Sequence, residues 1–135
     1  MTALLSFDVH LTESFAEAVD RVIKTLSKEG FGILTRIDVH EAFKEKLGVE
    51  FRPYTILGAC NPKLAHRAIS AVPQVGLFLP CNVTVECKPG GGSLVRIVNP
   101  EEMMRAGGFN NDKTVSAVGM DAYERLRRVA DHLAE

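Results

Sequence analysis

The segment CNVTVECKPGGGSLVRIVN (residues 81–99) limits the possible folds of this chain more than any other feature. Its first half, 81–88, alternates apolar and polar side chains with the period of a β-strand, and its second half, 93–99, is also strand-like in composition. The joining residues, Pro89-Gly90-Gly91-Gly92, are typical of a tight hairpin turn. Two strands joined by so short a connection pair antiparallel. The pattern therefore disfavours a doubly wound fold with a wholly parallel sheet.

Two other segments also alternate, and they predict strands over residues 3–11 and 33–39; a further strand is predicted after Pro53, over residues 54–60. Between and after the strands, apolar side chains recur at helical spacing behind residues that commonly cap helices. The predicted helices begin at the capping boxes Ser14–Glu17 and Asp38–Glu41, at Asn61-Pro62 (helix 62–71) and at Asn99-Pro100 (helix 100–106), and a last helix ends near Leu133.

The predicted order of elements is β-α-β-α-β-α-β-β-α-α. Alternating strands indicate a sheet with one covered face, because their apolar side chains point to one side only. We therefore expect an α+β fold, a two-layer sandwich with a mostly antiparallel sheet of about five strands and helices packed on one face. A length of 135 residues is that of one domain, which we expect to cover residues 1–135.

Composition and charge exclude several classes of function. A net charge of −1 and a sequence pI near 6.4 provide no broad basic surface for nucleic acid. The longest apolar run, Val75 to Leu79, is too short to span a membrane, and the N-terminal segment lacks the features of a secretory signal. Three cysteines, an odd number, disfavour a disulfide framework. We expect a cytoplasmic protein with reduced thiols and no nucleic-acid or membrane partner.

Cys60 is the strongest candidate for a reactive group, because it immediately precedes Asn61, the predicted N-cap of a helix. Free N–H groups and the positive end of the helix dipole favour a thiolate at such a position. A lowered pKa would suit a nucleophile, a redox centre or a metal ligand. The alternative is structural: Cys60 packs on Ala65, one turn into the helix, as a hydrophobic staple.

Cys81 opens the strand in which Cys81, Val83, Val85 and Cys87 share one face. The two valines indicate that this face points to the core, where cysteine commonly acts as a small apolar residue. Cys81 differs from Cys87 because Pro80 places it at the entrance of the strand, where its thiol could meet Cys60.

A metal site is the weaker hypothesis. Cys60, His66 and Cys81 could supply three zinc ligands and leave the fourth position open. Zinc motifs usually bring their ligands in close pairs such as C-x-x-C, and this chain contains none. His66 lies between Lys63 and Arg67, which is more typical of an exposed histidine.

Four blocks of sequence resemble the bacterial and archaeal family named domain of unknown function 302. They are FGILTRIDV (31–39), KLG (46–48), PYTILGACNP (53–62) and LPCNV (79–83). The resemblance implies a compact α+β domain that forms a homodimer, and it implies no established activity. It also marks a set of signature positions, which are Gly32, Asp38, Tyr54, Gly58, Cys60, Asn61, Pro62, Pro80, Cys81 and Asn82.

These observations lead to three hypotheses, none of which names a cofactor. The first is a small cytoplasmic binding or thiol-redox module, with a site for a small-molecule ligand at Cys60-Asn61-Pro62 and Pro80-Cys81-Asn82. Its candidate thiols are Cys60 and Cys81, and its candidate binding residues are Cys60, Asn61, Cys81, Asn82 and Tyr54. The second is a non-catalytic homodimeric interaction domain with packed cysteines. The third is a metal-binding protein.

Overall fold

The computed structural model describes residues 4–135, and within them five strands form one antiparallel sheet. The strand order is β1-β5-β4-β3-β2. The strands are β1 (Ser6–Leu11), β2 (Gly32–Asp38), β3 (Tyr54–Cys60), β4 (Cys81–Cys87) and β5 (Ser93–Val98). The predicted hairpin and the antiparallel sheet are confirmed. The first strand begins later than the predicted residue 3, which lies outside the described residues.

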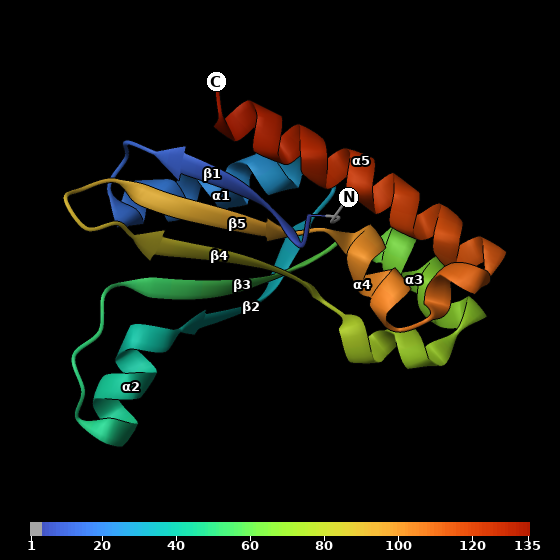
Figure 1. Cartoon of the computed structure of the whole chain (residues 1–135), viewed down its shortest axis with the longest axis horizontal. Coiled ribbons are helices and arrows are strands. Elements are labelled where there is room, and N and C mark those ends of the chain that lie inside the picture. The colour runs from blue at the N-terminus through green and yellow to red at the C-terminus, as the bar shows by residue number, and fades with distance from the viewer. Residues whose placement is uncertain (1–3) are drawn as a thin grey trace.

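Five α-helices and two 3-10 helices complete the described part of the chain. They are α1 (Phe15–Lys28), α2 (Val39–Leu47), α3 (Pro62–Ala71), α4 (Pro100–Ala106) and α5 (Lys113–Leu133), with 3-10 helices η1 (Pro73–Phe78) and η2 (Phe109–Asn111). The long α5 packs on α1, α3 and α4 (Figure 1). Only α2 stands apart from this layer, within the connection between β2 and β3 (Figure 1). The predicted α+β sandwich is confirmed.

The core lies between the sheet and the helix layer, and it follows from the alternation of the strands. Val83 and Val85 of β4 and Val95 and Ile97 of β5 are fully buried. Because successive side chains of a strand point to opposite faces, the even-numbered residues of β4 and β5 point to the face that carries no helices.

None of the helices within residues 4–135 is long and apolar enough to cross a membrane.

Three of the four predicted helix caps form as expected. The Ser14 hydroxyl accepts from the backbone N–H of Glu17, and the amide oxygens of Asn61 and Asn99 accept from N–H groups of α3 and α4. The predicted capping box at Asp38 is wrong, since this side chain makes no cap hydrogen bond. Its carboxylate instead accepts from the Thr55 hydroxyl of β3 at 2.7 Å. The hydrogen bond to Thr55 on the neighbouring strand thus forms in place of the expected bond to the helix N-terminus.

Two threonines in the centre of the sheet give opposite predictions for the same substitution. The Thr84 hydroxyl is buried and has no hydrogen-bond partner among the described residues, whereas the Thr55 hydroxyl donates to Asp38. We expect Thr84→Val to raise the free energy of unfolding by about 1 kcal/mol and Thr55→Val to lower it by about 1–3 kcal/mol. Urea denaturation measures both. A destabilised Thr84→Val variant would contradict this account.

Candidate functional site

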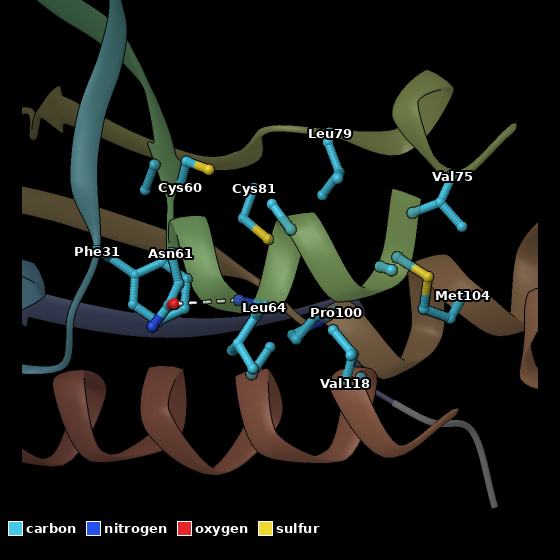
Figure 2. Close-up of a pocket in the computed structure, with 15 residues that line it drawn as sticks. Phe31, Cys60, Asn61, Leu64, Val75, Leu79, Cys81, Pro100, Met104 and Val118 are labelled. Atoms are coloured by element: carbon cyan, nitrogen blue, oxygen red, sulfur yellow. Dashed lines mark hydrogen bonds between the residues drawn. The ribbon is translucent and has the colours of Figure 1, made fainter. Parts of the chain in front are cut away.

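The Cys-Asn-Pro and Pro-Cys-Asn segments meet at one cavity of about 40 Å³. Cys60, Asn61 and Cys81 all contribute to its lining (Figure 2). They come together because β3 pairs antiparallel with β4, which places Ala59 directly opposite Cys81. The end of one strand and the start of the next therefore share one edge of the sheet, as the sequence hypothesis required.

The rest of the lining comes from the helix layer and is apolar. Leu64 belongs to α3, Met104 to α4 and Val118 to α5, and all three are buried (Figure 2). Cys81, which is only 7% exposed, lines the same cavity as these side chains. An engineered apolar cavity of about 150 Å³ binds benzene. This cavity is much smaller, so it has room only for the end of a slim apolar group, of methyl or ethyl size.

One side of the cavity is nearer to solvent than the rest. Cys60, Ala65 and Leu79 are only half-buried, and every other lining residue is buried. Figure 2 shows Cys60 and Leu79 on the side of the cavity away from α5. The two cysteines therefore differ in position, since Cys60 lies at the entrance and Cys81 forms part of the wall.

The expected lowering of the Cys60 pKa is not what the surroundings of this side chain favour. Burial raises the pKa of the Cys60 thiol. Burial, with a smaller effect from neighbouring Cys60, raises the pKa of Cys81 to about 11. Both thiols are free, with no disulfide between them. At neutral pH the site therefore presents two protonated, polarizable sulfur atoms rather than a thiolate.

Asn61 is buried, and its side-chain amide is bonded within the protein. The amide oxygen accepts from the backbone N–H of Leu64 at 3.3 Å, which caps α3. The amide nitrogen donates to the carbonyl oxygen of Glu29 at 3.4 Å, at the end of α1. Arg125 of α5 donates to the same carbonyl at 3.2 Å. Asn61 thus ties the start of α3 to the end of α1, where α5 is also bonded through Arg125, and it holds Cys60 at the entrance.

The three candidate zinc ligands are not all brought together, because His66 lies apart from Cys60 and Cys81. His66 is exposed on α3 and does not line the cavity. No group of three or more His, Cys, Asp or Glu side chains suited to a metal ion occurs within residues 4–135. The spacing Cys60–His66 gave no close ligand pair, and the structure places this histidine on the solvent side of its helix.

Two other predicted binding residues lie outside the cavity. Asn82 is exposed on β4 and lies opposite Gly58, on the face without helices. Tyr54 opens β3, at the other end of that strand from Cys60. Its backbone N–H donates to Nδ1 of His40 at 3.0 Å, and its ring lies 6.4 Å from that of Phe51. Neither side chain can reach a ligand held beside Cys81.

Sequence reasoning missed most of the cavity wall. Phe31, Leu64, Met104, Val118 and Ala122 all line it, yet in the sequence they are ordinary apolar positions. Helical spacing can show that such residues face the core, but it cannot show where the core is incompletely filled. The position of the cavity depends on how α3, α4 and α5 meet, which local patterns do not encode.

Comparison with known proteins agrees with this architecture. The model of the family described as "Domain of unknown function DUF302" matches residues 7–133. Among solved structures, the crystal structure of an uncharacterized conserved DUF302 protein from Bacillus stearothermophilus is similar, with a TM-score of 0.84 and 30% sequence identity. The match covers 97% of this chain and 99% of that one. A comparison with curated proteins gives no match. The resemblance seen in the four sequence blocks is thus confirmed, and the chain belongs to the DUF302 family.

Proposed function

We propose that this protein is a small-molecule-binding module whose site is the apolar cavity between the Cys-Asn-Pro and Pro-Cys-Asn segments. The observation that carries the proposal is the cavity itself, which is lined almost wholly by apolar groups and has a half-buried entrance at Cys60. Pockets of this kind bind through shape and apolar contact. The ligand class is a molecule with a slim apolar end, such as a short alkyl or thioether group.

The two cysteines contribute as neutral sulfur atoms in this proposal. Sulfur is polarizable and makes favourable contacts with apolar groups of irregular shape. The raised pKa values of Cys60 and Cys81 support binding over thiol-redox chemistry, because a protonated thiol is a poor nucleophile. The Asn61 amide fixes the entrance and does not contact the ligand.

Binding of the short alcohols methanol, ethanol and 1-propanol tests the proposal by NMR. We expect amide shifts at Cys60, Leu64 and Cys81 that depend on chain length and saturate. Val118→Leu fills part of the cavity, so it should weaken binding about fivefold or more. Met120→Leu is the matched control because Met120 lies exposed on the same helix, outside the cavity. Absence of binding, or equal affinity in the Val118→Leu variant, would refute the proposal.

A second candidate function, a homodimeric interaction domain, is favoured by the exposed edge of the sheet. Edge strand β2 carries exposed Leu34 and Ile37, and α2 has no buried residue. Unpaired edge strands are sites for strand addition. Antiparallel pairing with a second copy of β2, centred on Ile37, would place Arg36 of each strand opposite Asp38 of the other, which makes this edge complementary to itself in charge.

Sedimentation velocity tests the dimer. We expect a dimer for the wild-type chain at tens of micromolar. Ile37→Glu should be a monomer, because the new carboxylate would be buried between the two β2 strands without a partner of opposite charge. Leu77→Glu is the control, since Leu77 is an exposed apolar residue remote from β2 in the sequence. A monomeric wild-type chain, or a dimer unaffected by Ile37→Glu, would refute this second candidate.

A further inference from the structure

A second concave region, separate from the cavity, lies where the β4–β5 hairpin turns. It has a volume of about 510 Å³ and is lined by Arg52, Glu86, Lys88 and Arg96 with a few uncharged neighbours. Glu86 is near the end of β4 opposite to Cys81, and Figure 1 shows the hairpin turn at the opposite end of the sheet from α3 and α4. Nothing in the proposed function uses this region.

The centre of the region is a buried carboxylate that holds two arginines. The Glu86 side chain is 7% exposed, and its Oε2 accepts from Nε of Arg52 at 2.7 Å. Its Oε1 accepts from Nη1 of Arg96. Burial alone would raise the pKa of Glu86, but the hydrogen bonds from Arg52 and Arg96 outweigh it and lower the pKa. Glu86 is therefore ionised at neutral pH and fixes both guanidinium groups.

Most hydrogen-bonding capacity of these arginines is unused. A guanidinium carries five N–H donors, and within residues 4–135 neither Arg52 nor Arg96 donates a side-chain hydrogen bond except to Glu86. The two side chains are 48% and 40% exposed. Their remaining donors are thus available beside the concave region, at positions that the shared carboxylate holds in place.

The charge of the region is positive. Three cationic side chains line it against the single carboxylate of Glu86. Lys88 adds an ammonium group 3.4 Å from Nδ1 of His10. A further carboxylate, Asp8, lies across the strands from Arg96 but does not line the region and accepts from the Ser6 hydroxyl at 2.6 Å. The lining therefore favours an anion.

We propose that this region binds the phosphate or carboxylate group of a small molecule. Guanidinium groups match both anions in geometry and bind them through paired, charge-assisted hydrogen bonds. Lys88 supplies a third cationic contact. The Arg52 guanidinium carbon lies 4.5 Å from the centre of the Phe51 ring, and this contact helps to hold that side chain in place.

Isothermal titration at low ionic strength tests the site with two probes, inorganic pyrophosphate and citrate, which distinguish phosphate from carboxylate ligands. We expect at least one probe to bind, and added salt to weaken it. Arg96→Gln should weaken binding about tenfold or more, and Lys88→Gln about threefold or more. Arg127→Gln is the control, because Arg127 is exposed on α5 and does not line the region.

Two further measurements keep the test decisive. Arg96→Gln leaves the Glu86 carboxylate with Arg52 as its one partner, so the stability of this variant must be checked by thermal unfolding. Lys88→Gln leaves both contacts of Glu86 intact. The alcohol-binding experiment on the apolar cavity should give the same affinity in every variant of this region. The proposal is overturned if neither probe binds the wild-type protein, or if Arg127→Gln weakens binding as much as Lys88→Gln does.

Discussion

Replacing Gly58 with alanine should destabilise this protein by about 2–3 kcal/mol. Gly58 lies in the middle of β3, between β2 and β4. A Cβ atom there would lie 2.8 Å from Cγ of Pro80 and closer still to Oγ1 of Thr35. The threonine can rotate away, but the rigid proline ring cannot, so β3 and the Pro80-Cys81 segment would have to move apart.

Gly32→Ala is the matched control for this substitution. Gly32 is on the adjacent strand β2, has no positive φ angle, and would place its Cβ atom in open space. We expect it to change the free energy of unfolding by about 0.5 kcal/mol or less. Urea denaturation of both variants measures the difference. Equal stability of the two variants would show that the packing of Pro80 on β3 does not matter.

The second large effect is expected at Cys81. Cys81→Ser places a hydroxyl in the buried apolar wall, where the lining provides no evident polar partner, and should cost about 2 kcal/mol. Cys60→Ser should cost about 1 kcal/mol or less, because Cys60 lies half-exposed at the entrance.

Chemical denaturation and cavity binding, measured on both variants, check this contrast. Cys81→Ser should also weaken alcohol binding more than Cys60→Ser does, since Cys81 belongs to the buried wall of the proposed binding cavity. If Cys60→Ser were the more damaging of the two substitutions, the assignment of Cys60 to the entrance and Cys81 to the wall would be wrong.

Much of the fold could be predicted from the sequence because its signals are local. The alternation of Val83 and Val85 fixed the buried face of β4, and the pairs Asn61-Pro62 and Asn99-Pro100 marked the starts of α3 and α4. Asp38 shows where this reasoning fails. Its position suited a capping box, yet Thr55 of the neighbouring strand takes its carboxylate. A preference inferred from neighbouring residues in the sequence fails where a residue on another strand offers a better-placed hydrogen-bond donor.

The candidate site was predicted in part. The hypothesis that Cys60 and Cys81 lie together agrees with the structure, in which both line one cavity. The rule that a helix N-terminus lowers the pKa of a preceding thiol takes no account of burial, and burial raises the pKa of Cys60. The Glu86 pair with Arg52 and Arg96 has no sequence signal, because its members lie on three segments that only the folded sheet brings together.

The pH dependence of Cys60 alkylation tests the central claim most directly, namely that the two motifs form an apolar cavity with protonated thiols. Iodoacetamide labelling followed by peptide mass spectrometry separates Cys60 from Cys81. We predict that the labelling rate of Cys60 rises with a midpoint above about 8.5, the pKa of an unperturbed thiol, and that Cys81 reacts more slowly at every pH. A midpoint for Cys60 below about 7.5, as in activated thiols, would contradict the account and restore thiolate chemistry at this site.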